Sequence, residues 1–251
     1  LDSSDVWSNP MQFQLDKDNK PTGVAGVPPD YFSEDGQLWG NPLYNWEKMK
    51  EDGYAWWTAR LQKALSLYDL VRIDHFRGFD RFYAIPAGSV NAKVGRWCDG
   101  PKESLFEGKK DWKIIAEDLG ILDEGVYRLM RNVGYPRMKV LEFAFDGNPE
   151  QEFKPSNYAD DNCVVYTGTH DNATFIEFLQ DLDEEAREVF YKDLVSECKK
   201  ANKRFYYSPS WLQSMTRRLH SPRWLRLPTS KRCSVHARQP FASLTAVAQN
   251  M

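Results

Sequence analysis

Four short apolar segments, alternating with helical patterns, constrain the fold of this chain more than any other feature of its sequence. They lack polar alternation, which is typical of strands buried on both faces of a sheet. The segments are residues 70–74, 114–116, 138–145 and 163–166. Apolar residues recur at helical spacing in residues 44–68, 123–133, 173–182 and 184–201. This alternation predicts an α/β fold in which helices cover a parallel sheet.

The residues before the first predicted helix have the composition of a long loop. Residues 8–45 contain three breakers, which are Asn9-Pro10, Pro28-Pro29 and Asn41-Pro42. A loop of this length is too long for a simple connector, so we expect it to bind a ligand.

Three of the four predicted strands end in an acidic residue, namely Asp74, Glu117 or Asp171. The carboxyl ends of parallel strands meet at one edge of a sheet, where the active sites of α/β folds lie. We therefore expect these carboxylates to converge. Polar turns follow the strands of any α/β protein, which is the alternative explanation, but it explains a single acid better than three.

Several carboxylates without a metal cluster suit glycosyl transfer. In retaining enzymes one ionised carboxylate attacks the anomeric carbon while a second, protonated carboxyl group donates to the leaving oxygen. Arg72 lies two residues before Asp74, so both side chains point to the same face of the strand. A guanidinium at this position favours an ionised carboxylate. A plain ion pair is the alternative for Arg72, and the two roles are compatible.

The sequence argues against several other classes of protein. No apolar run approaches the roughly 20 residues of a membrane span, and the first residues do not form a signal peptide. The spacing of the four histidines and four cysteines predicts no metal site. We expect free thiols at Cys98, Cys163, Cys198 and Cys233. Free thiols are typical of a cytoplasmic protein, which is the location we expect.

Three motifs in order resemble the 4-alpha-glucanotransferases, the amylomaltase or disproportionating-enzyme family (glycoside hydrolase family 77) of the α-amylase clan. They are Arg72-Ile73-Asp74-His75-Phe76-Arg77-Gly78-Phe79, Ile115-Ala116-Glu117-Asp118-Leu119-Gly120 and Tyr166-Thr167-Gly168-Thr169-His170-Asp171-Asn172. Two stretches of the loop, residues 24–32 and 36–44, resemble the same family. The resemblance runs from about residue 2 to residue 182.

The resemblance implies a (β/α)8 TIM barrel, present here only in part, and a role for each acid. Asp74 matches the nucleophile, Glu117 the general acid and base, and Asp171 the carboxylate that stabilises the transition state. The residues that match substrate-binding positions of the family are Arg72, His75, His170, Tyr31, Phe32, Trp39 and Asn41. The family needs no cofactor and no metal.

The implied activity moves α-1,4-glucan segments from a donor to a glucose or maltodextrin acceptor by a retaining double displacement. Relative to the family, the chain resembles an internal-to-C-terminal fragment. We therefore expect it to be inactive alone. The alternatives are an α-amylase-type hydrolase and a non-catalytic maltodextrin-binding remnant. Nucleic acid and membrane are not expected as partners.

The end of the chain differs sharply in charge from the rest. Nine basic residues and no acidic residue lie between residues 201 and 251, although the whole chain has a net charge of -3. A nucleic-acid arm, an unstructured extension and a shifted reading frame are the three interpretations, of which the first is the weakest. We predict a partial catalytic barrel over residues 1–205, including the glucan-covering loop 8–45, and a basic tail over 206–251.

Overall fold

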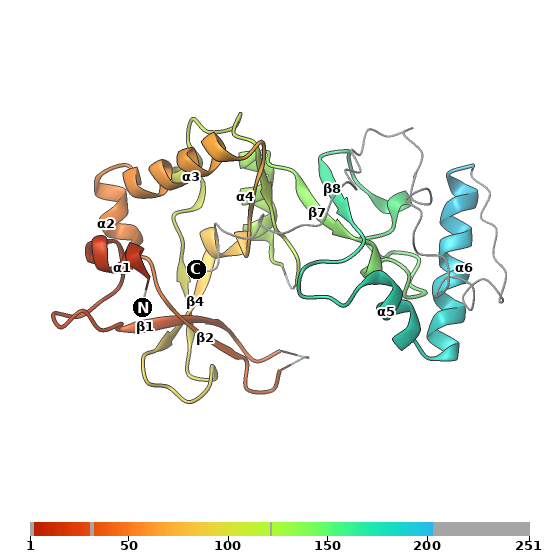
Figure 1. Cartoon of the computed structure of the whole chain (residues 1–251), viewed down its shortest axis with the longest axis horizontal. Helices are drawn as coiled ribbons and strands as arrows, with labels where there is room; N and C mark the ends of the chain where they lie inside the picture. Colours follow the sequence, from red (N-terminus) through yellow and green to blue (C-terminus); the bar gives the residue numbers. More distant parts are fainter. Residues whose placement is uncertain (1–2, 31–32, 121, 203–251) are drawn as a thin grey trace. The chain divides into compact units, whose positions relative to one another are not determined.

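The structure is a computed structural model that describes residues 3–30, 33–120 and 122–202 of the 251-residue chain. The chain divides into two compact units, and the described residues of the first end at Arg137 while those of the second begin at Met138 (Figure 1). The predicted boundary between residues 205 and 206, and with it the basic tail, lies outside the described residues.

The first unit combines short strands with helices and 3-10 turns. Its helices are α1 (Ser4–Ser8), α2 (Trp46–Glu51), α3 (Ala55–Leu67) and α4 (Glu124–Val133). Its strands are β1 (Gly23–Val27), β2 (Gln37–Pro42), β3 (Val71–Ile73), β4 (Arg81–Pro86), β5 (Arg96–Asp99) and β6 (Ile114–Ala116). Its 3-10 turns are η1 (Pro10–Gln12), η2 (Phe76–Phe79) and η3 (Lys102–Phe106).

Two of the predicted buried strands pair in parallel, as expected. In the β3–β6 pair Val71 is opposite Ile114 and Ile73 is opposite Ala116, and all four side chains are buried. Continuous burial explains why these strands have no polar alternation. The pair therefore ends at the same level on both strands, which places the residues that follow them side by side.

The helix predicted over residues 123–133 is also confirmed, with caps at both ends. The Asp123 carboxylate accepts hydrogen bonds from the backbone N–H groups of Gly125 and Val126, which α4 itself does not satisfy. At the other end Gly134 has φ 75°, a left-handed conformation that glycine adopts without strain.

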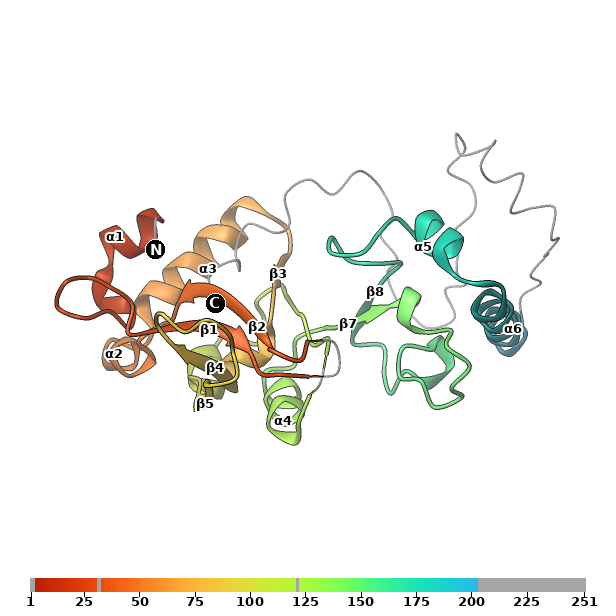
Figure 2. The same ribbon diagram turned by 90° about the horizontal axis from the view of Figure 1, so that it is seen from below.

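The interpretation of residues 8–45 as one long loop is wrong. This segment contains β1 and β2, which join β4 and β5 in an antiparallel sheet of order β2-β1-β4-β5 (Figures 1 and 2). Gly26 is the reason that a glycine-rich segment forms the centre of a sheet. A Cβ atom at this position would lie 2.2 Å from the carbonyl oxygen of Gln37, so only glycine allows β2 to approach.

The single helix predicted over residues 44–68 is in fact two helices. Gly53 and Tyr54 both have positive φ angles, 67° and 61°, and end the helical path between α2 and α3. The Asp52 carboxylate then accepts a hydrogen bond from the Ala55 backbone N–H at the start of α3. Asp-Gly is a turn dipeptide, so the sequence contained the break.

Aromatic side chains form much of the core of the first unit. Trp57 of α3 is fully buried, and its ring centroid lies 5.4 Å from that of Phe79 and 5.2 Å from that of Tyr44. Phe76 of η2 and Phe106 of η3 extend the same cluster. Because each such ring buries a large apolar area, this cluster anchors η2, which directly follows the acid at the end of β3.

The second unit contains the remaining helices, strands and 3-10 turns of the described residues. They are β7 (Arg137–Val140, of which Arg137 belongs to the first unit), η4 (Leu141–Phe143), η5 (Pro155–Asn157), β8 (Cys163–Tyr166), α5 (Phe175–Asp181) and α6 (Glu184–Lys200). The strand over residues 163–166 and both helices are confirmed, and β7 pairs with β8. The strand predicted over residues 138–145 stops at Val140, where the backbone turns into η4.

Candidate active site

Asp74 and Glu117 occupy equivalent positions at the ends of paired strands. Ile73 and Ala116 are opposite each other in the β3–β6 ladder, and each acid is the next residue. The backbone N–H of Glu117 donates to the carbonyl oxygen of Ile73 (3.0 Å), which extends the ladder to this level. Neighbouring strands lie about 4.8 Å apart, so the two acids are neighbours on one edge, as the sequence predicts.

Arg72 pairs with Asp74. The distance between Arg72 Nη2 and Asp74 Oδ1 is 2.6 Å, and the two side chains are 13% and 37% exposed. The pair follows from the alternation of side chains along β3, which points residues 72 and 74 to the same face. Asp74 therefore keeps an accessible carboxylate beside a fixed positive charge.

Glu117 is buried and held at both carboxylate oxygens. Oε1 accepts a hydrogen bond from the Leu119 backbone N–H and Oε2 from that of His75, each at 2.6 Å. Burial is the largest influence and raises the pKa of Glu117 to about 7, and the negative charge of Asp74 also raises it. The two backbone hydrogen bonds and Arg72 oppose this change. Two neighbouring carboxyl groups thus have different environments, one suited to a nucleophile and one to an acid.

His75 links the two acids through its backbone. Its φ of 47° lies in the left-handed region, and in this conformation its N–H meets the Glu117 carboxylate. Desolvation, followed by the nearby Arg77, lowers the pKa of the His75 imidazole to about 4, although part of its surface remains accessible. The ring is therefore neutral at pH 7 and offers one donor and one acceptor.

The strain at His75 gives a first prediction. We expect the chain with His75→Gly to be more stable than that with His75→Ala by roughly 1 kcal/mol. Both changes remove the imidazole, but only glycine adopts the left-handed conformation without strain, which costs other residues roughly 1–2 kcal/mol. Part of this gain is lost because glycine gives the unfolded chain more conformational entropy. Urea unfolding of the two variants measures the difference. An alanine variant of equal or greater stability would refute the role of the backbone strain.

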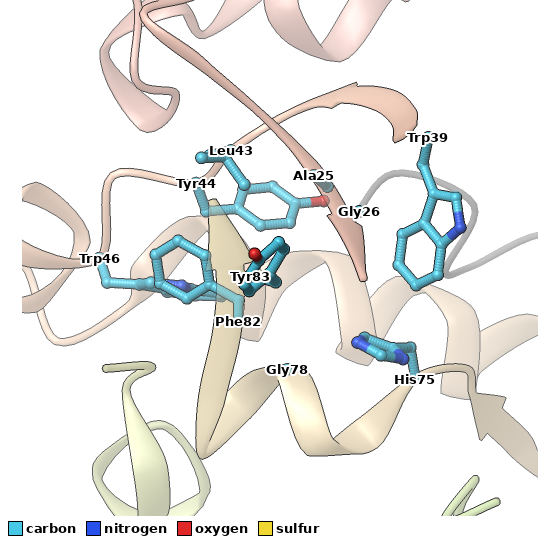
Figure 3. Close-up of a pocket in the computed structure, with 10 residues that line it drawn as sticks. All are labelled: Ala25, Gly26, Trp39, Leu43, Tyr44, Trp46, His75, Gly78, Phe82 and Tyr83. Atoms are coloured by element: carbon cyan, nitrogen blue, oxygen red, sulfur yellow. The ribbon is translucent and has the colours of Figure 1, made fainter. Parts of the chain in front are cut away.

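An aromatic pocket lies beside His75 in the first unit (Figure 3). The Trp39 ring of β2 faces the His75 ring edge-on, with centroids 4.9 Å apart. The pocket is lined by Ala25, Gly26, Trp39, Leu43, Tyr44, Trp46, His75, Gly78, Phe82 and Tyr83. Trp46, Phe82 and Tyr83 did not emerge from the sequence as candidate residues. The aromatic pair that follows the Asp74 motif, Phe82-Tyr83, was the available clue. Tyr44, Trp46 and Tyr83 are buried, whereas Trp39 is exposed, so its ring is available to the apolar face of a sugar.

The structure describes two of the four binding residues that the sequence predicts on the loop. Trp39 is 38% exposed and its Nε1 donates to the Gln37 side chain (3.0 Å). Asn41 is partly buried on β2. Tyr31 and Phe32 lie outside the described residues.

Asp171 and His170 belong to the second unit, in the turn that follows β8. His170 Nε2 lies 3.3 Å from Asp171 Oδ1, and the two side chains are 43% and 81% exposed. Asn172 Oδ1 accepts hydrogen bonds from the N–H and hydroxyl groups of Thr169, at 2.8 and 2.7 Å, and closes the turn. The structure thus defines Asp171 within its own unit, while it brings Asp74 and Glu117 together in the first.

Sequence reasoning missed one further acid. Glu142 is buried two residues beyond the end of β7. The sequence pattern of acids at strand ends includes Glu142 once the strand ends at Val140. The predicted strand extended to residue 145 and therefore hid this acid.

Other features of the described residues concern metals, thiols and membranes. Within the described ranges there is no group of three or more His, Cys, Asp or Glu side chains that could hold a metal ion. Cys98, Cys163 and Cys198 are free thiols, while Cys233 is not described. Among the described helices, none has the length and apolar character needed to cross a membrane.

Arg137, the first residue of β7, forms an ion pair with the buried carboxylate of Asp118. Its Nε lies 2.5 Å from Asp118 Oδ2, and the Asp118 side chain is 1% exposed. Asp118 follows Glu117 directly, so this pair fixes the backbone on the far side of the acid.

Comparison with known proteins gives consistent results. Residues 1–223 match the family model described as 4-alpha-glucanotransferase, so the match extends beyond residue 205. The 4-alpha-glucanotransferase of Thermus thermophilus is 52% identical over 178 residues, which are 69% of this chain and 36% of that protein. That of Streptococcus pneumoniae is 50% identical over 193 residues, 74% of this chain and 38% of its own length.

A solved structure supports the same conclusion. The amylomaltase from Streptococcus agalactiae in complex with acarbose has a TM-score of 0.73 and 39% sequence identity, covering 83% of this chain and 41% of that one. The predicted fold class, a partial TIM barrel, is confirmed. The chain spans about two fifths of the length of these relatives.

Proposed function

Because the chain belongs to the 4-alpha-glucanotransferase family, we propose that it carries the catalytic residues of an enzyme that transfers α-1,4-glucan segments to glucose or maltodextrin acceptors. The observation that carries this proposal is the placement of Asp74 and Glu117 on paired strand ends in unlike environments. A retaining mechanism needs two carboxyl groups about 5–5.5 Å apart, which neighbouring strands provide.

In the first step the Asp74 carboxylate attacks the anomeric carbon of the donor. Glu117 gives its proton to the glycosidic oxygen as that bond breaks, and the reducing-end segment leaves. Arg72 keeps the nucleophile in place through its ion pair with Asp74. In this proposal Asp171 and His170 hold sugar hydroxyls and stabilise the oxocarbenium-like transition state, the roles that match the family.

In the second step Glu117 acts as a base. The negative charge of Asp74 is one of the causes that raise the pKa of Glu117. When Asp74 becomes a glucosyl ester this charge disappears, so the pKa of Glu117 falls as the residue must accept a proton. The 4-hydroxyl group of the acceptor then loses its proton to Glu117 and attacks the anomeric carbon, and the ester bond to Asp74 breaks.

The pocket in Figure 3 supports transfer rather than hydrolysis. Trp39, which is 38% exposed and lies edge-on to His75, provides an apolar surface on which an acceptor sugar displaces water. We also propose a cytoplasmic location, supported by the free thiols of the described cysteines.

The test uses a grafted enzyme in which residues 3–202 replace the matching segment of the Streptococcus agalactiae amylomaltase. With maltotriose as substrate we expect glucose and maltopentaose, the products of transfer. An α-amylase-type hydrolase would instead give glucose and maltose without longer chains. A maltodextrin-binding remnant would bind maltoheptaose in calorimetry and give no products.

For the 251-residue chain alone we expect no transfer. Catalysis requires the carboxyl groups to be held to about 0.5 Å, and the buried strands of the described residues form two separate pairs, β3–β6 and β7–β8. Glucose release from maltotriose by the purified chain, with its Glu117→Gln variant as the blank, measures this. Release clearly above the blank from monomeric protein would contradict the expectation.

A further inference from the structure

The proposed mechanism does not use the buried carboxyl group of Glu142. This residue lies in η4, directly after β7, and is 7% exposed. Its backbone N–H donates to the carbonyl oxygen of Thr167 at 3.1 Å. Glu142 is therefore fixed to the segment that follows β8.

The Glu142 carboxyl group packs on Gly168. A Cβ atom built on Gly168 would lie 2.7 Å from Oε1, 2.9 Å from Oε2 and 2.9 Å from Cδ of Glu142. No positive φ requires glycine at this position, so the absence of a side chain serves the close approach of the carboxyl group. The turn with His170 and Asp171 starts at the next residue, Thr169.

The turn over residues 169–172 is closed by hydrogen bonds of its own. Besides the two bonds from Thr169 to Asn172, the backbone N–H of Asp171 donates to the Thr169 hydroxyl group at 3.2 Å. The position of the whole turn thus depends on its base at Gly168, where Glu142 lies.

The carboxyl group itself is in an unusual state. Among the described residues, Oε1 of Glu142 is a buried oxygen without a hydrogen-bond partner. Burial raises the pKa of Glu142, and no neighbouring charge contributes to this change. Of the ionisable side chains on the adjoining elements, Lys139 of β7 pairs with Glu152, and His170 lies beside Asp171. A neutral acid tolerates this site better than a carboxylate does.

We propose that Glu142 is a positioning residue of the candidate active site, whose carboxyl group sets the position of the His170–Asp171 turn through its packing on Gly168. This inference rests on the proposed function, because the position of the turn matters only where its side chains bind sugar. Ionisation of Glu142 places a charge at the base of the turn and therefore displaces it.

Amide proton–nitrogen correlation spectra of the labelled 251-residue chain test this. Every sample carries His170→Gln, so that no imidazole within the observed residues changes its charge over the same pH range. We expect the signals of residues 168–172 to shift with pH in a step above the ordinary carboxyl range. In Glu142→Gln the step disappears and the signals keep their low-pH positions. Glu150→Gln, which changes an exposed acid of the same unit, keeps the step. A step that persists in Glu142→Gln, or that is absent when Glu142 is intact, overturns the proposal.

A double-mutant comparison tests the contact without relying on charge. Gly168→Ala forces the carboxyl group away and is expected to displace the turn signals, but much less so when Glu142→Ala is already present. Equal shifts in both backgrounds overturn the proposal. In the grafted enzyme, Glu142→Ala is expected to weaken maltoheptaose binding about tenfold, the loss that one misplaced hydrogen bond causes, and Glu142→Gln is expected to restore it. If no variant binds sugar while the spectra respond as expected, the proposed function fails and the placement of Glu142 stands.

Discussion

Replacing Asp74 with alanine is expected to abolish glucan transfer by the grafted enzyme. Asp74 is the acid that combines an accessible carboxylate with a fixed guanidinium at 2.6 Å and a neighbouring proton donor at the paired strand end. Without it no covalent glucosyl intermediate forms, so we expect the rate to fall by several orders of magnitude. Glucose and maltopentaose formed from maltotriose, followed over days, measure the residual rate.

The control for this change is Asp69→Ala. Asp69 is an exposed acid just before β3, so its removal changes the net charge equally and leaves the strand end intact. We expect this variant to keep full activity. Melting curves of both variants establish that each remains folded. Near-normal transfer by a folded Asp74→Ala enzyme would exclude Asp74 as the nucleophile.

The parts of the site that were predictable are those fixed by local pattern. An apolar strand buried on both faces is recognisable from its residues alone, and parallel pairing then brings the following residues together. Asp74 and Glu117 are 43 positions apart in the chain but occupy adjacent positions on one edge. The spacing of Arg72 and Asp74 likewise predicted their ion pair, because side chains alternate along a strand.

The antiparallel sheet was not predictable by the same reasoning. β1 pairs with β4, and Val24 is opposite Ile85, so the contact that stabilises both strands is distant in sequence. Locally, the glycines of β1 are typical of a loop. Gly26 is instead required because the β2 backbone at Gln37 approaches it closely, and only the folded arrangement reveals this contact. Strand formation also depends on the partner strands more than on intrinsic propensity.

Replacing Glu117 with glutamine is expected to have an effect that depends on the donor. With maltotriose, transfer should fall by several orders of magnitude, because the amide has no proton to give to the glycosidic oxygen. With α-maltosyl fluoride the leaving group needs no acid, so Asp74 should still become glycosylated. Azide should then accelerate product release, since it needs no base. Its nitrogen bonds to the anomeric carbon as the ester bond to Asp74 breaks, which gives α-maltosyl azide.

The pH dependence separates this role of Glu117 from a merely structural one. Burial raises the pKa of Glu117 to about 7, so its acid form predominates below that pH and is lost as the pH rises through it. Transfer from maltotriose by the unmodified grafted enzyme should therefore decline above about pH 7. The pKa of Glu117 lies in the ordinary carboxyl range in the unfolded chain and at about 7 in the folded one, so the folded state binds the extra proton and loses stability as the pH rises between these two values. Glu117→Gln removes the ionising group, so between the ordinary carboxyl range and about pH 7 its melting temperature should fall less than that of the unmodified enzyme. An equal fall in both, or azide rescue that fails although the fluoride donor is consumed, would show that Glu117 is not the acid and base of this site.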